Sequence, residues 1–277
     1  MNAKRFSYPV IPCLRTMMTT MKTDPDERSL YRFLSEYGAE LLGSGASCIR
    51  LEKNISRIAR HYGRDTEIVI MPRHIHITVW SPGHDDAFTA ISSISRKGIS
   101  FNINTLLSRL SWHIADNKID FEQSVKCFKR IISDRHQNPW AVLLAVSAAN
   151  ASFCRLFGGD ISAMLIVAFA TAVGYYIKQF TLRHKVDLRV VFLICSFVSA
   201  VLGSTGILFD IGSTPRIALA TSILYLVPGI PFINSFSDML YKYYICALGR
   251  LADALVLTAC LSAGLCAAML LMNISMF

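Results

Sequence analysis

The second half of this chain is apolar enough to cross a membrane several times. Five apolar segments occupy residues 140–157, 161–180, 188–209, 217–236 and 251–277. Each is close to the roughly 20 residues that a helix needs to span the hydrocarbon core of a bilayer. Backbone polar groups must be hydrogen-bonded within lipid, so these segments are predicted to be packed helices. We therefore expect a five-helix transmembrane domain over residues 139–277.

The first half of the chain has a different composition. Up to residue 138 it contains 20 of the 28 basic residues and 14 of the 19 acidic residues, without a long apolar run. Periodicity predicts one long helix, three strands and two amphipathic helices. They cover residues 29–61, 66–71, 74–80, 88–96, 104–116 and 120–133. We expect a small cytosolic α+β domain over residues 29–138, after an N-terminal extension of residues 1–28, to which no role is assigned.

The loops between the apolar segments differ in positive charge, which indicates orientation. The loop at residues 158–160 has no Lys or Arg, and the one near residue 210 has only Arg216. The second loop carries Lys178, Arg183, Lys185 and Arg189, and the fourth carries Lys242 and Arg250. Because basic loops stay cytoplasmic, we expect a cytoplasmic N-terminus and a C-terminus on the outer side. The basic first half suits anionic membrane lipid, and no aromatic-basic motif indicates nucleic acid.

The fourth apolar segment is interrupted. Pro228 and Pro231 each remove a backbone donor, and Gly229 permits a sharp bend. Polar side chains follow directly: Asn234, Ser235 and Asp238. Backbone carbonyls freed at membrane depth are tolerated only inside protein or beside a wet cavity. We therefore predict that this segment is part of a substrate path.

Three further residues in the apolar half are candidates for the same path. Asn150 lies in the middle of the first segment, Arg155 near its end and Asp160 in the following loop. Ionisable and polar groups are costly in a membrane and tend to face the bundle interior. Each has a plainer interpretation: an interhelical hydrogen bond for Asn150, snorkelling for Arg155 and an ordinary loop position for Asp160.

Catalytic and metal-binding patterns find no support in the sequence. His74 and His76 share a strand face but lack a third ligand, and the eight cysteines show no metal-type spacing. No phosphate-binding glycine loop or nucleophile motif stands out. We expect no catalytic residue, metal or cofactor, and no structural disulfide.

The order of several short motifs resembles the threonine/serine exporter family, and most closely its short YjjP-type members. In the first half the resemblance rests on Gly45, Ala46, Arg50, Glu52 and Asn104. In the second half it rests on residues 156–160, residues 227–229, and Asn234, Ser235 and Asp238. The resemblance covers nearly the whole chain, roughly from Ser29 onward.

This resemblance implies one subunit of a two-component bacterial inner-membrane exporter. A YjjB-type small membrane protein supplies the second half, and the solutes are threonine and serine or a dicarboxylate such as succinate. Five spans place the chain ends on opposite sides, so a second such unit would be inverted, as in many secondary transporters. Because no nucleotide site is visible, an ion gradient is the expected driving force. The alternative is a membrane-anchored metabolite sensor or regulatory scaffold without transport activity.

Overall fold

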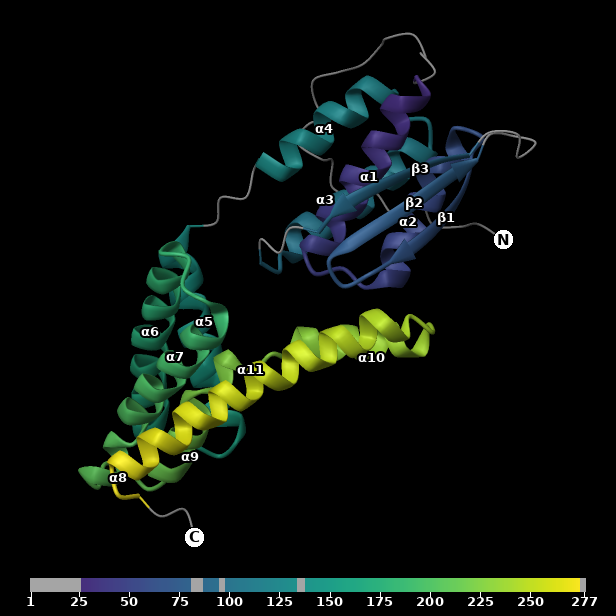
Figure 1. Ribbon diagram of the computed structural model, residues 1–277. Coiled ribbons are helices and arrows are strands. Elements are labelled where there is room, and N and C mark those ends of the chain that lie inside the picture. Colours follow the sequence, from purple (N-terminus) through teal and green to yellow (C-terminus); the bar gives the residue numbers. More distant parts are fainter. Residues whose placement is uncertain (1–25, 81–86, 95–97, 134–137, 275–277) are drawn as a thin grey trace, which may run out of the picture. The chain divides into compact units, whose positions relative to one another are not determined.

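The computed structural model describes residues 26–80, 87–94, 98–133 and 138–274 (Figure 1). These residues form two compact units. Unit 1 is built from the described part of Met1–Arg135 together with Ile233–Arg250. Unit 2 is built from the described part of His136–Phe232 together with Leu251–Phe277. Most described residues are helical, and the one sheet lies in unit 1.

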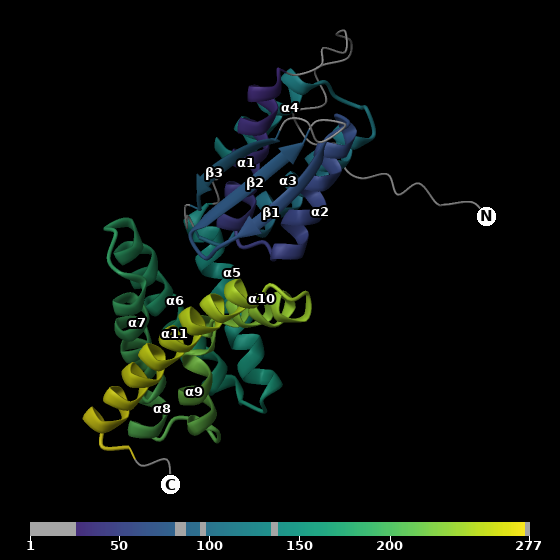
Figure 2. The same ribbon diagram turned by 45° about the vertical axis from the view of Figure 1, so that its right-hand side comes forward.

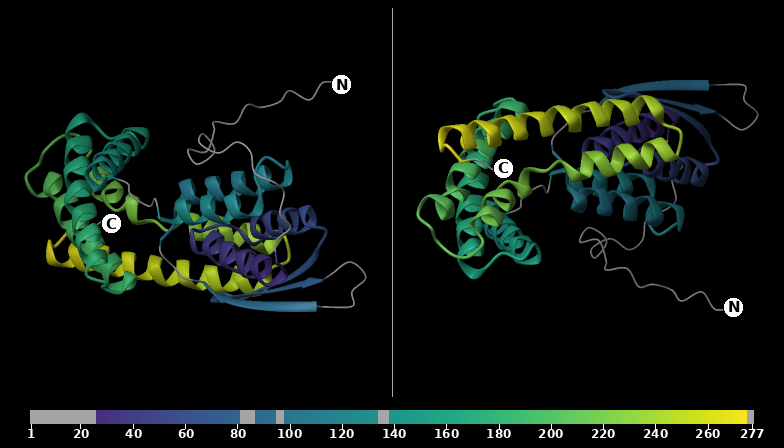
Figure 3. Two further views of the ribbon diagram at one scale, coloured as in Figure 1. Left: turned by 90° about the horizontal axis from the view of Figure 1, so that it is seen from above. Right: turned by 90° about the horizontal axis from the view of Figure 1, so that it is seen from below.

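Unit 1 contains a three-stranded antiparallel sheet in the order β1-β2-β3 (Figure 2). The strands are β1 (Asp65–Ile70), β2 (His74–Trp80) and β3 (Ala87–Ser93). The helices are α1 (Glu27–Gly43), α2 (Cys48–His61), α3 (Phe101–Ala115) and α4 (Phe121–Ser133). In both views of Figure 3 the sheet lies along one side of this unit. Ile75, Ile77 and Val79 alternate along β2 and are buried, as expected for a strand with one covered face.

The long first helix predicted from the sequence is two helices, α1 and α2, in the structure. They are separated by Ser44–Ser47, where Gly45 has a φ of +90°. A side chain at Gly45 would be strained by this backbone conformation, and its Cβ would lie 3.0 Å from the side chain of Ile99. The predicted helix is therefore completely broken at this point, which frees the N-terminus of α2.

Unit 2 contains the apolar helices. They are α5 (Pro139–Leu156), α6 (Ile161–Arg183), α7 (Leu188–Gly203), α8 (Thr205–Leu208), α9 (Pro215–Ser222) and the short 3₁₀ helix η2 (Leu224–Leu226). Two further helices contribute residues to both units: α10 (Gly229–Leu240) and α11 (Tyr244–Leu271). Four helical stretches are long and apolar enough to span a membrane, or up to five if α9 to α10 form one broken span. The described chain is thus a mostly helical membrane protein with a small sheet near its N-terminus.

The predicted interruption of the fourth segment is present. η2 ends at Leu226, and α10 begins at Gly229. Pro231 lies in the first turn of α10, where the missing N–H costs no intrahelical bond. The segment that follows is grouped with unit 1 and not with the apolar helices, because Cys246 is part of the unit 1 core.

Candidate functional site

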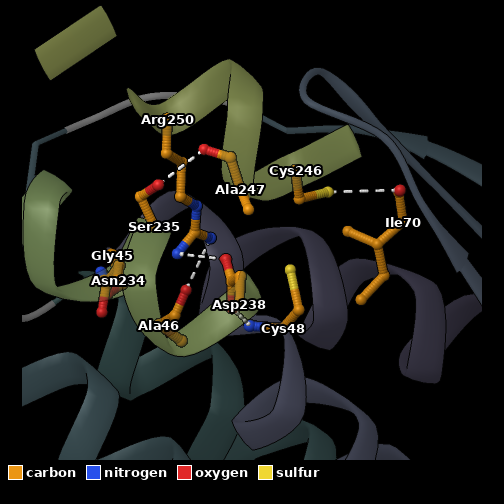
Figure 4. A network of polar contacts seen from close by, with 10 residues as sticks. All are labelled: Gly45, Ala46, Cys48, Ile70, Asn234, Ser235, Asp238, Cys246, Ala247 and Arg250. Atoms are coloured by element: carbon orange, nitrogen blue, oxygen red, sulfur yellow. Dashed lines mark hydrogen bonds and ion pairs between the residues drawn. The ribbon is translucent and has the colours of Figure 1, made fainter. Parts of the chain in front are cut away.

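The segment Ile233–Arg250 forms a helical hairpin within unit 1. It contains the end of α10, a turn at Tyr241–Tyr243 and the beginning of α11. The Ser235 hydroxyl donates to the Ala247 carbonyl at 2.7 Å and so joins the two helices (Figure 4). We call the polar contacts between this hairpin and the α1–α2 region the hairpin cluster.

Asp238 is the central residue of the hairpin cluster. It is fully buried, and its Oδ1 accepts a hydrogen bond of 2.8 Å from the backbone N–H of Cys48 (Figure 4). Its Oδ2 lies 3.2 Å from Nη1 of Arg250. Cys48 is the first residue of α2, and the preceding Ser47 makes no side-chain capping bond. A carboxylate 190 positions further along the chain therefore caps this helix and meets its positive end.

Two carbonyls of the α1–α2 connection bind the same hairpin. Arg250 Nη2 donates to the Ala46 carbonyl at 2.8 Å, and Asn234 Nδ2 donates to the Gly45 carbonyl at 2.9 Å (Figure 4). Tyr243 also donates a hydrogen bond to Glu52 on α2. The family motif of the first half and the polar residues after the break, which the sequence presents separately, meet here. Arg250 and Tyr243 were not among the candidates predicted from the sequence.

Arg50 and Asn104 of the same motif lie outside the hairpin cluster. Arg50 is exposed on α2, whereas Asn104 is buried at the start of α3. The Oδ1 of Asn104 has no hydrogen-bond partner among the described residues. The structure therefore brings together Gly45, Ala46 and Glu52 but not the whole motif.

A second group of polar side chains lies inside unit 2, and we call it the bundle cluster. Asn150 on α5 is buried, and its Nδ2 donates to Thr171 Oγ1 on α6 at 2.7 Å and to the Thr221 carbonyl on α9 at 3.1 Å. The hydroxyls of Ser199 and Tyr225 are hydrogen-bonded at 2.9 Å. The interhelical hydrogen bond considered for Asn150 is thus present, and it joins three helices.

Lys178 adjoins the bundle cluster from α6. Its Nζ lies 5.7 Å from the ring centre of Tyr175 and 5.2 Å from that of Phe192 on α7. The Tyr175 ring in turn packs against Tyr225 at 6.2 Å. In the sequence Lys178 served only as an indicator of orientation. The signal that could have identified it as a candidate is its position within the second apolar segment and not after it.

A groove of about 410 Å³ opens on unit 2 beside Thr221. Its lining residues are Phe157, Arg216, Ile217, Ala220, Thr221 and Leu224. Arg216 is exposed and is the second residue of α9. It makes no hydrogen bond or ion pair with any residue in the described part of the chain. In the sequence this arginine is recognisable only as a loop charge, and no local pattern indicates its place at a groove.

Arg155 and Asp160 make local contacts near the same end of α5. Arg155 Nη1 donates to the Gly159 carbonyl at 3.1 Å. Asp160 caps α6 by accepting the Ala163 N–H at 2.7 Å, and it accepts the Ser213 N–H at 2.6 Å. These bonds, above all that from Ala163, hold the pKa of Asp160 below its ordinary value. Asp160 therefore remains ionised at neutral pH, and its hydrogen bonds connect the start of α6 to the loop at Ser213.

The described residues contain no group of three or more His, Cys, Asp or Glu side chains that could hold a metal ion. The polar side chains of unit 1 and unit 2 described above cap helices, as Asp238 and Asp160 do, or form interhelical hydrogen bonds, as Asn150 does. Lys178 and Arg216 instead make no ion pair among the described residues.

Comparison with known proteins agrees with the resemblance noted in the sequence. The sequence profile described as "Putative threonine/serine exporter" matches residues 32–272. The protein "Probable succinate transporter subunit YjjP" of Klebsiella aerogenes is 29% identical over 254 residues, which are 90% of this chain and 96% of that relative. The protein of the same name from Escherichia coli K12 is 28% identical over 242 residues, or 86% of this chain and 92% of that relative. No solved structure is significantly similar.

Proposed function

The chain belongs to the threonine/serine exporter family, and we propose that it is one subunit of a two-component inner-membrane exporter of small carboxylates or amino acids. The observation that carries this proposal is the match along nearly the full length of relatives named as succinate transporter subunits. Those relatives are transporter subunits and not enzymes. Succinate is therefore the first solute to test, with threonine and serine next.

The second component in this proposal is a YjjB-type small membrane protein. The word "subunit" in the relatives' names supports a partner. The positive charges of the loops support a cytoplasmic N-terminus and an outer C-terminus. An ion gradient drives export in this scheme. The polar residues of the fourth segment, from Asn234 to Asp238, then lie towards the cytoplasm.

In this scheme the hairpin cluster couples the broken segment to the first unit. The broken segment continues directly into the hairpin, and the hairpin is held by buried bonds to α2 and the α1–α2 connection. In this proposal, a movement at Pro228 and Gly229 reaches the first unit along the chain. The candidates Asn234, Ser235 and Asp238 act in this proposal by coupling that movement, because Ser235 and Asp238 are buried and cannot meet a solute while the hairpin is docked.

The test of the proposed function is solute efflux from a strain that lacks both components. Cells carrying the chain, its partner or both are loaded with labelled succinate, threonine or serine, and the initial rate of release is measured. We expect rapid release of at least one solute only when both components are present, and loss of release when an uncoupler collapses the proton gradient. Release at the rate of the empty strain for all three solutes contradicts the proposal.

The same strain distinguishes an exporter from a membrane-anchored sensor. Replacing Pro228 and Gly229 together by Ala favours a continuous helix through the break. For an exporter we expect release to fall at least tenfold while the amount of protein in the membrane is unchanged. A sensor instead tolerates this change and binds a metabolite through its first unit.

A further inference from the structure

Lys178 is a cation turned towards the interior of the helix bundle. It lies five residues before the end of α6 at Arg183, which corresponds to about 7.5 Å along the helix axis. Its ammonium lies over Tyr175, one turn towards the N-terminus of α6, and over Phe192 of α7. A lysine that snorkels reaches instead for the nearby membrane surface. Lys178 therefore points along the bundle and away from the end of its helix.

This ammonium lacks a negative partner. Among the described residues, Lys178 makes no hydrogen bond or ion pair, and its ammonium lies near two aromatic rings. A charge inside a membrane bundle is costly unless it is paired, and a cation–π contact offsets only part of that cost. An anionic solute would supply the missing counter-charge. A partly enclosed lysine of this kind is a binding group for a carboxylate.

Arg216 is the corresponding cation at the groove. It lies at the N-terminal end of α9, where the helix dipole adds positive charge, and it is likewise unpaired among the described residues. The guanidinium fork matches both oxygens of a carboxylate. The groove of about 410 Å³ is within the range of small-molecule sites, and Phe157, Ile217 and Leu224 provide apolar walls for a short carbon chain.

The bundle cluster connects the surroundings of the two cations. Tyr175, beneath Lys178, packs against Tyr225, whose hydroxyl bonds to Ser199. Further along α6, Thr171 bonds to Asn150, and Asn150 bonds to the Thr221 carbonyl. Thr221 lines the groove that contains Arg216. Polar groups thus extend through the bundle from the surroundings of one unpaired cation to those of the other.

We propose that Lys178 and Arg216 are the carboxylate-binding cations of the solute path in this subunit, and that the bundle cluster lines the path between them. The inference rests on the proposed export function and adds the residues and the charge of the solute. It requires that each exported solute carry a carboxylate. In this proposal unit 2 binds the solute. The hairpin cluster of unit 1 does not, because its Asp238 and Arg250 are already paired with each other.

The test uses cells that contain the full chain and its partner, loaded with increasing concentrations of labelled succinate. Lys178→Met removes the charge at similar length and makes membrane insertion easier, so loss of the protein is not expected. Arg216→Gln removes the second charge. We expect the half-saturating internal concentration to rise at least tenfold in each variant, with less than a threefold change in maximal rate. Lys178→Arg retains a positive charge and should stay within threefold of the unaltered chain.

Arg183→Gln is the matched control, because Arg183 is an exposed cation of the same helix outside the cluster. It should leave half-saturation within twofold of the unaltered chain. Normal half-saturation in both Lys178→Met and Arg216→Gln overturns the inference and leaves the proposed function intact. A fall in maximal rate alone, with unchanged half-saturation, also overturns it, since that result indicates a structural role. If the unaltered chain with its partner exports no succinate, threonine or serine, both proposals fail.

Discussion

The two polar clusters of this protein differ in whether the charges in and beside them are paired. In the hairpin cluster the Asp238 carboxylate is fully buried and meets both Arg250 and the N-terminus of α2. Beside the bundle cluster, Lys178 and Arg216 have no anionic partner among the described residues. A paired buried charge holds parts of a protein together, whereas an unpaired cation in an apolar setting is available to a ligand. We therefore interpret the hairpin cluster as a docking contact within unit 1 and the bundle cluster as the candidate path of the solute.

The largest effect that we expect is from Asp238→Ala. The change leaves Arg250 without its carboxylate and removes the acceptor at the N-terminus of α2. Removing one partner of a buried ion pair costs about 3–5 kcal/mol. The midpoint of thermal unfolding of the purified protein should fall sharply, as should its amount in the membrane.

The matched control for this change is Asp238→Ala combined with Arg250→Met. Removing both charges should recover part of the lost stability, because no uncompensated ion remains. Equal stability of Asp238→Ala and the unaltered chain would contradict the role assigned to the hairpin cluster.

A smaller effect is expected from Asn150→Ala in the bundle cluster. The change removes hydrogen bonds to Thr171 and to the Thr221 carbonyl. Interhelical hydrogen bonds in membrane proteins contribute about 0.6 kcal/mol on average and up to about 1.7 kcal/mol. We expect a modest fall in thermal stability but a clear fall in succinate efflux. Ser152→Ala on the same helix, which loses only an exposed bond to Ala148, serves as the control. A loss of stability without any loss of efflux would place Asn150 outside the path.

The smallest effect concerns Asp160 and depends on pH. Its pKa is lowered in the folded protein, mainly by the N–H of Ala163, so its stabilising effect is present above the ordinary carboxyl pKa of about 4. That contribution is lost as the pH falls through the lowered value. The unfolding midpoint of Asp160→Asn should therefore lie below that of the unaltered chain at pH 7, and the difference should shrink as the pH falls below about 4. A difference that persists unchanged at pH 3 would assign the effect to something other than charge.

Much of the fold was predictable because it depends on local patterns. The apolar segments identified the membrane helices, and the Pro-Gly-Ile-Pro sequence located the break between Leu226 and Gly229. β-Branched alternation placed β1 and β2 within about a residue of their ends. The prediction of one helix before the sheet was wrong because Gly45, with its positive φ, ends α1 and does not merely bend it. The membership of the family was also evident from the order of motifs, and the match over residues 32–272 confirms it.

The candidate site was only partly predictable. Asn150 was identified because a polar amide in an apolar run is conspicuous by itself, and the structure supplies its partners. Asp238 was predicted as a residue of the substrate path; its buried contact with the N-terminus of α2 supports the coupling role that we propose for it instead. Lys178 and Arg216 were overlooked because a cation near the end of an apolar segment looks the same in sequence whether it faces water or the bundle.

The sequence by itself determined the membrane class of the chain, its family and the position of its broken segment, since these follow from composition and from short motifs. Only the tertiary structure decided which charges are neutralised. Asp238 and Cys48 are 190 positions apart, and Asn234 and Gly45 are 189 apart, so no local pattern reveals that they touch. The free energy of a buried charge depends on the groups within a few ångströms of it, and folding chooses those groups.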